Sequence, residues 1–123
     1  MSERERRVPR SAAPEPGSVR MVEVDGRRIG LFNVAGRFYA LADRCPHRGG
    51  PLCSAGEIVG QVMRENGEVR LVGEGEFVRC PWHKWDFEIA TGRAPADGRM
   101  RVRRYAVRVD GDEVVVSLGL PLD

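Results

Sequence analysis

The chain has 123 residues, of which 41% are hydrophobic and 31% are charged, and its formal net charge is +2. This length fits one domain with a modest core, and this composition excludes both a membrane protein and a wholly disordered chain. No apolar run approaches the roughly 20 residues of a transmembrane helix, and no broad basic surface with aromatic residues is indicated. We therefore expect a soluble, cytoplasmic protein that binds neither a membrane nor nucleic acid.

Residues 1–17 are rich in proline and charge and poor in apolar residues, which predicts a disordered N-terminal tail. From residue 18 onward, short runs of β-branched and aromatic residues alternate with turn residues, and we predict one domain over residues 18–119. Two such runs, 19–24 and 28–34, flank Asp25–Gly26. This dipeptide is a strong hairpin signal, because glycine tolerates the positive φ that a type I′ turn requires.

A second hairpin is predicted around Asn66–Gly67, inside a segment, 57–76, that holds five glutamates and two arginines. No window of the sequence shows helical periodicity. Many short strands at regular spacing are typical of an all-β sandwich or a small barrel. The other strands are expected at 38–42, 77–79, 85–90, 101–109 and 113–118.

The expected strand 101–109 lies in an arginine-rich segment. Residues 93–108 hold six arginines and a single aspartate, and we weigh a docking face for an acidic partner against a merely solvated face. Within the strand, Val102 and Tyr105 fall on opposite phases of the two-residue period. A bulge near Arg103–Arg104 would reconcile them.

Two short segments concentrate metal-binding residue types. Cys45-Pro46-His47 and Cys80-Pro81-Trp82-His83 each join one thiol to one imidazole beside a proline, and 32 residues separate His47 from Cys80. They use both histidines of the chain and two of its three cysteines. Chance placement of both histidines beside Cys-Pro is a poor explanation. We therefore predict a metal site with two sulfur and two nitrogen ligands.

Two kinds of metal site suit these four ligands, tetrahedral zinc and an iron–sulfur cluster. Zinc fingers usually take a cysteine pair from one loop and a histidine pair from the other, whereas here each segment supplies one of each. This mixed order favours a two-iron cluster in which one iron takes both thiolates and the other takes both imidazoles. A structural zinc-binding module is the alternative.

These motifs closely resemble the two cluster-binding motifs of Rieske 2Fe–2S proteins, and the likeness covers residues 18–119. It rests on Cys-Pro-His-Arg-Gly-Gly-Pro-Leu, on Cys-Pro-Trp-His-Lys-Trp-Asp-Phe and on the trailing Ala-Thr-Gly-Arg. The resemblance implies a Rieske-type antiparallel β-sandwich with a small cluster-binding subdomain, whose loops span about residues 43–54 and 78–88. It further implies one 2Fe–2S cluster per chain, with Cys45 and Cys80 on one iron and His47 and His83 on the other.

The sequence departs from two branches of that family. Trp82 stands where the Rieske proteins of quinol-oxidising complexes have a second-loop cysteine, so their cross-cluster disulfide is not expected here. Cys53 is interpreted as a structural thiol, with a role in ligation as the minor alternative. We expect neither the membrane anchor of those complexes nor the mononuclear iron domain of ring-hydroxylating oxygenases. Of the branches considered, the small ferredoxin type is therefore the one that the sequence resembles.

The resemblance implies a one-electron carrier that exchanges electrons with a reductase and with a terminal oxygenase or reductase. The small subunit of a nitrite-reductase-like enzyme is the alternative within the family. No hydride-carrier fingerprint, P-loop or nucleophile triad is present, so we expect no substrate chemistry of its own. Trp85 and Phe87 stand where high-potential Rieske proteins carry a serine and a tyrosine, which predicts a potential toward the low end of the Rieske range.

Overall fold

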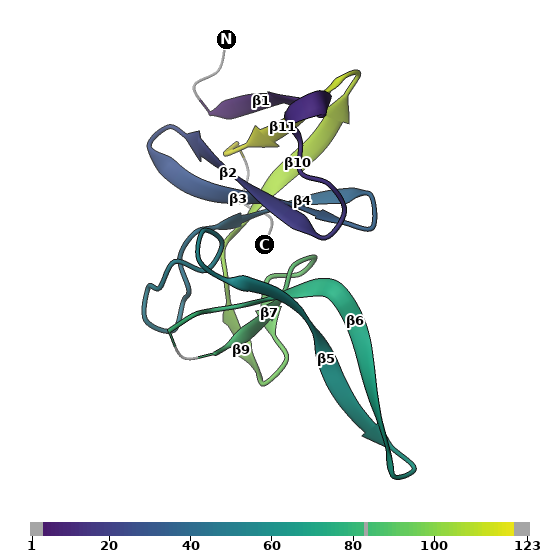
Figure 1. Cartoon of the computed structure of the whole chain (residues 1–123). Helices are drawn as coiled ribbons and strands as arrows, with labels where there is room; N and C mark the ends of the chain where they lie inside the picture. Colours follow the sequence, from purple (N-terminus) through teal and green to yellow (C-terminus); the bar gives the residue numbers. More distant parts are fainter. Residues whose placement is uncertain (1–3, 83, 120–123) are drawn as a thin grey trace.

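A computed structural model describes residues 4–82 and 84–119, and every strand pairing within them is antiparallel (Figure 1). The predicted all-β fold is therefore confirmed. Six strands form the larger sheet, in the order β1-β11-β10-β4-β3-β2. They are β1 (Glu5–Pro9), β2 (Ser18–Val24), β3 (Arg27–Val34), β4 (Arg37–Ala42), β10 (Arg104–Asp110) and β11 (Glu113–Ser117).

Two smaller sheets lie below the larger one in Figure 1, and we call them, with the loops that join their strands, the subdomain. One consists of β5 (Glu57–Glu65), β6 (Glu68–Arg79) and β7 (Asp86–Glu88), and the other of β8 (Arg93–Ala94) and β9 (Asp97–Arg101). A short 3-10 turn covers Arg10–Ala12. Within the described residues, no helix is long and apolar enough to cross a membrane.

Strand β3 separates two apolar cores. Ile29 and Leu31 face a core inside the larger sheet, which also contains valines of β1, β2 and β11. Phe32 faces a second core, between the larger sheet and the subdomain, that also contains Cys45 and Cys80. Because both faces of β3 are covered, its middle is buried without alternation. The two cysteines therefore lie in the core that Phe32 of β3 also lines.

The hairpin turns follow the sequence signals. Asp25 and Gly26 have φ of 49° and 76°, and Asn66 and Gly67 have φ of 53° and 79°. Positive φ at both central residues defines a type I′ turn, whose twist matches that of the flanking strands. The residues of the two predicted Asx-Gly hairpins therefore adopt the backbone conformation that their identity favours.

The N-terminal segment differs from the prediction of a disordered tail over residues 1–17. Residues 5–9 form β1, which pairs along its whole length with β11, and Val8 is buried in the larger sheet's core. Arg7 donates to Asp110 at 3.1 Å and to Glu113 at 3.0 Å across this ladder. β1 is ordered by its pairing with β11, which lies more than 100 residues away in the chain. Local composition therefore gave the wrong expectation for this segment.

The expected strand 101–109 is two strands rather than one bulged strand. β9 ends at Arg101 and pairs with β8, whereas β10 begins at Arg104 and pairs with β4 and β11. Val102, in the gap, donates its N–H to Gly92 at 2.8 Å and is buried. The change of phase therefore marks the crossing from one sheet to another.

The β5–β6 hairpin projects away from the rest of the molecule (Figure 1). We call residues 57–76 the arm. The ladder is regular from Gln61↔Val72 to Glu65↔Glu68, but it is interrupted between Val59 and Gln61. Beyond this interruption four large apolar side chains are more than half exposed: Val62 (68%), Met63 (51%), Val69 (60%) and Leu71 (55%).

Candidate metal centre

The two cysteine–histidine segments lie in two loops of the subdomain. The first loop runs from β4 to β5 over residues 43–56, and the second joins β6 to β7 over residues 80–85. Both loops enter the core below the larger sheet, where Cys45 and Cys80 are each 1% exposed. Segments far apart in the chain are therefore brought together at one place.

The first loop closes tightly around its cysteine. Gly49 donates its N–H to the carbonyl of Cys45 at 2.7 Å, and Cys45 donates its own N–H to the carbonyl of Gly50 at 2.8 Å. Gly49 has a φ of 77°, a conformation that glycine adopts without strain. The loop thereby turns back on itself within six residues and presents His47 at its apex.

Gly50 is required by the close approach of the two loops. A Cβ at this position would lie 2.9 Å from the indole of Trp82 and 3.2 Å from the sulfur of Cys80. The backbone of the first loop thus lies directly against the second cysteine. Any larger residue would push the loops apart and separate the two sulfurs.

The thiols of Cys45 and Cys80 lie within hydrogen-bonding reach of one another. Burial raises the pKa of Cys45, and the neighbouring Cys80 raises it further, while the backbone N–H groups of His47 and Arg48 donate to the Cys45 sulfur and lower it. Two buried, adjacent thiols with N–H donors directed at the sulfur suit a cation-bound thiolate pair. This donor set fits an iron that takes both cysteines.

The second loop is closed at its base by both backbone and side chains. Cys80 donates its N–H to the carbonyl of Trp85 at 2.8 Å. The flanking residues Arg79 and Asp86 are register partners, and Arg79 binds Asp86 through two bonds of 2.7 and 3.0 Å. Gln61 of β5 donates to the same carboxylate at 2.7 Å. Three strands therefore hold the ends of this loop together.

An aspartate at the start of the first loop holds its far half. Asp43 accepts backbone N–H bonds from Cys53 at 2.7 Å and Ser54 at 3.0 Å, and the Ser54 hydroxyl at 2.7 Å. Its side chain is only 3% exposed. Burial raises the pKa of Asp43, but these bonds and the guanidinium of Arg28 outweigh burial, and the net pKa is lowered. Nothing in the sequence pattern singled out this residue.

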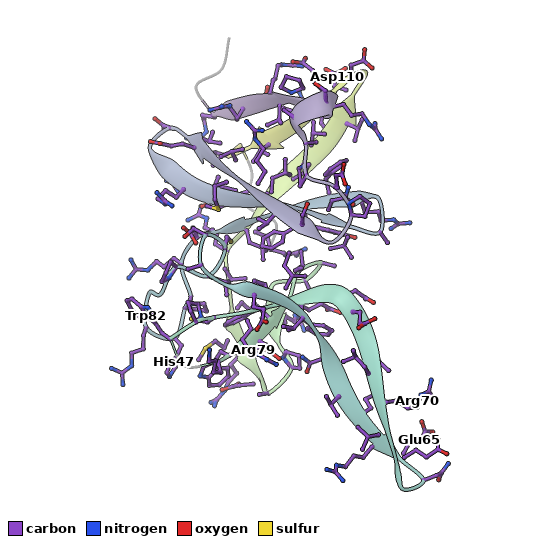
Figure 2. The ribbon with its side chains drawn as sticks, in the orientation of Figure 1. His47, Glu65, Arg70, Arg79, Trp82 and Asp110 are labelled. Carbon is purple, nitrogen blue, oxygen red and sulfur yellow. The ribbon has the colours of Figure 1, made fainter. Side chains whose placement is uncertain are left out.

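Of the predicted histidine ligands, His47 lies in the first loop with its ring 5.3 Å from that of Trp85, centroid to centroid. His47 and the half-exposed Trp82 lie on the same side of the subdomain, away from the end of the arm (Figure 2). His83 lies outside the described residues. Within those residues, no group of three or more His, Cys, Asp or Glu side chains is gathered as for one metal ion.

Cys53 has a packing role in the structure. It is 2% exposed, and a Cβ on Gly30 of β3 would lie only 2.5 Å from its Cβ. Its thiol donates to the carbonyl of Ala42 at 3.4 Å. Burial, with a smaller contribution from Asp43, raises its pKa far above the ordinary thiol value. A neutral thiol packed against β3 fits the structural interpretation made from the sequence.

The arginines of residues 93–108 are divided between two sheets. Arg93, Arg99 and Arg101 belong to the β8–β9 sheet, whereas Arg104 and Arg108 belong to β10 of the larger sheet. Several bind within the chain, since Arg99 pairs with Asp97 at 3.2 Å, Arg108 pairs with Glu5 at 2.9 Å and Arg104 donates to the carbonyl of Ala90 at 3.0 Å. Docking of an acidic partner on part of this segment stays a prediction.

Comparison with known proteins identifies the centre. The Rieske [2Fe-2S] domain family matches residues 6–106. The chain belongs to this family. The ferredoxin component of the naphthalene 1,2-dioxygenase system of Pseudomonas aeruginosa is 30% identical over 103 residues, which cover 83% of this chain and 84% of that protein. The match begins inside β1.

Two solved structures share the fold. A ferredoxin of carbazole 1,9a-dioxygenase from Nocardioides aromaticivorans IC177 has a TM-score of 0.65 and 25% identity, over 91% of this chain and 94% of that one. A chain from a structure entitled "Complex of reduced oxygenase and oxidized ferredoxin in carbazole 1,9a-dioxygenase" has a TM-score of 0.72 and 24% identity, over 99% and 100%. The Rieske fold and its 2Fe–2S cofactor expected from the motifs are thereby confirmed, and the zinc alternative is not supported.

Proposed function

We propose that this chain is a one-electron carrier that delivers electrons to a terminal oxygenase. The supporting observation is the pair of loops that brings two buried, adjacent thiols to the base of a half-exposed tip carrying His47. In this proposal Cys45 and Cys80 hold one iron, and His47 and His83 hold the other. When bound, a 2Fe–2S cluster supplies a one-electron redox couple.

The residues of the chain then divide the remaining tasks. Cys45 and Cys80 anchor the cluster in the core, where Phe87 and the other apolar side chains exclude water. Gly50 keeps the loops in contact, and the Arg79–Asp86 pair fixes the ends of the second loop. Trp82, beside the second cysteine, is 54% exposed and His47 is partly exposed, which suits electron exchange with a docked protein.

The oxygenase as electron acceptor is inferred from the relatives. The sequence relative named above is the ferredoxin component of a dioxygenase system, and one similar solved structure is described as a complex of oxygenase and ferredoxin. A reductase is the natural electron donor in such a system. We place the protein in the cytoplasm as part of the same proposal, because its three cysteines are free of disulfides and cytosolic thiols stay reduced.

Electron counting tests this function directly. The purified full-length holoprotein should take up one electron per chain, and the reduced form should be reoxidised by an oxidised Rieske oxygenase faster than by dissolved oxygen. The His47→Ala variant serves as the matched control without a normal cluster. Uptake of one electron without any transfer to an oxygenase would contradict the proposed acceptor but leave the cofactor assignment intact.

A further inference from the structure

The arm has an apolar face that no other part of the described chain covers. The register places Val62 opposite Leu71 and Arg64 opposite Val69, so these four side chains share one face of the ribbon. Three of them are apolar and 55 to 68% exposed. An isolated two-stranded ribbon is marginally stable in water, and exposed apolar patches of this kind mark interaction sites.

Arg64 is the one charged residue among these four, and it lies near the outer end of the arm. The root of the arm has the opposite charge, since it carries Glu57, Glu74 and Glu76, all exposed. At the outer end, Glu65 is paired with Arg70 at 3.7 Å, and both residues are labelled at the end of the hairpin in Figure 2. The arm is thus cationic on its apolar face near the end and acidic at its root.

A groove of about 480 Å³ lies at that root. Glu74 and Glu76 of β6 lie on one wall, and the other wall comes from the larger sheet and includes Arg37 and Tyr39. In Figure 1 the hairpin bends away from the larger sheet along this part of β6. The groove therefore contains two carboxylates, one guanidinium and an aromatic side chain, so acidic groups outnumber basic ones in its lining.

We propose that the arm is a self-association surface on which a second copy of this chain docks with two-fold symmetry. The two apolar faces stack with the ribbons antiparallel, as sheets pack in a sandwich. Each outer end then reaches the other copy's root, where Arg64 of one copy meets Glu74 and Glu76 of the other. Both contacts are equivalent, so the assembly closes as a dimer and does not extend into a filament.

The small size of this surface determines the expected affinity of the dimer. Five residues of a strand span about 17 Å, so two stacked ribbons bury less than the roughly 1,200 Å² typical of stable complexes. The two reciprocal groove contacts add to that area. We therefore expect a weak dimer that forms between micromolar and millimolar protein and dissociates further as salt is added.

Sedimentation of the full-length holoprotein over this concentration range tests the proposal. The wild-type mass should rise toward twice that of one chain as the concentration increases. Val62→Ser together with Leu71→Ser should weaken the dissociation constant at least tenfold. The matched control is Val109→Ser, because Val109 is 51% exposed on β10 and lies outside the arm, and its constant should stay within twofold of wild type.

A charge swap distinguishes this arrangement from other uses of the arm. Two variants should each weaken self-association about tenfold, because each places like charges together. One is the single variant Arg64→Glu, and the other is the double variant Glu74→Arg with Glu76→Arg. A mixture of the two variants should form a heterodimer close to wild-type strength, since both contacts are again complementary. A wild-type monomer at every concentration, an arm variant that dimerises normally, or a mixture that stays monomeric would each overturn the proposal. The mass measurement does not depend on electron transfer, so its failure leaves the proposed function untouched.

Discussion

The cluster loops and the arm are built on the same two strands but have opposite environments. At one end of β5 and β6, Val78 and Cys80 are buried in a core with several short hydrogen bonds around the loop. At the other end, beyond the interruption at Val59/Gln61, the side chains are mostly exposed and the one ion pair is 3.7 Å long. One end is defined by contacts within the chain, and the other leaves large apolar side chains exposed.

The largest expected effect is on cluster content, which should fall when the cluster loops are changed and not when the arm is shortened. Ala at Cys45, His47, Cys80 or His83 should abolish the normal Rieske cluster, because each residue supplies one of four protein bonds to iron. In contrast, replacing residues 62–71 by Asn-Gly should keep full iron and sulfide content. Gln61 and Val72 are register partners, so a two-residue type I′ turn can join them without strain.

Metal and sulfide analysis of these variants checks the prediction, with Cys53→Ser as the control cysteine that should retain the cluster. Loss of the cluster on shortening the arm would show that the arm is part of the cluster-binding structure. Retention of a normal cluster in any of the four alanine variants would remove that residue from the ligand set.

A second expected effect concerns stability at the first loop. Asp43→Ala should lower the free energy of unfolding by about 2–4 kcal/mol, because it leaves the N–H groups of Cys53 and Ser54 without their carboxylate. Arg28→Ala removes only the exposed end of the 3.3 Å ion pair with Asp43 and should cost at most about 0.5 kcal/mol. Urea unfolding of the two variants measures the difference, and equal losses would contradict the role given to Asp43.

A third expected effect compares the two ion pairs on β6. Asp86→Asn should destabilise the holoprotein by about 1–2 kcal/mol and speed cluster loss to a chelator, since it weakens a two-bond pair that Gln61 shares. Glu65→Gln, in the exposed pair at the arm's end, should change neither quantity measurably. Identical chelation rates for the two variants would show that the pair at the loop does not hold it closed.

The smallest expected effect is on the redox potential. Phe87 is fully buried in the core that contains both cysteines, and its ring has no donor. Phe87→Tyr adds one hydroxyl, which should raise the potential if it donates to a cluster sulfur, because such a bond favours the more negative reduced form. Val69→Ser in the arm is the matched control and should leave the potential unchanged. A fall in potential for Phe87→Tyr would contradict this explanation.

The sequence predicted the metal ligands more clearly than the residues that hold their loops in place. Cys45 and Cys80 could be found because each lies beside a proline and within three residues of a histidine. Asp43 and Gln61 could not, because their bonds to Cys53 and Asp86 join positions that no local pattern connects. The same limit explains β1, which is ordered by a strand at the far end of the chain.

The hairpin of the arm was predicted from Asn66–Gly67, but its exposure was not. Turn residues fix the register of a hairpin, whereas burial depends on what lies above each face. Val62 and Leu71 have the composition of a core strand, and only the structure shows that they lie beyond the body of the protein. The phase change at Val102 likewise became interpretable once β9 and β10 were seen in different sheets.

The central claim is that this chain carries electrons on a Rieske cluster held by two cysteines and two histidines. A spectroelectrochemical titration of the purified full-length protein, with iron and sulfide analysis of the same sample, tests it most directly. We predict two irons and two sulfides per chain and a one-electron transition in the lower part of the Rieske range of about −150 to +300 mV. A colourless protein that contains zinc, or a transition near the top of that range, would contradict the account.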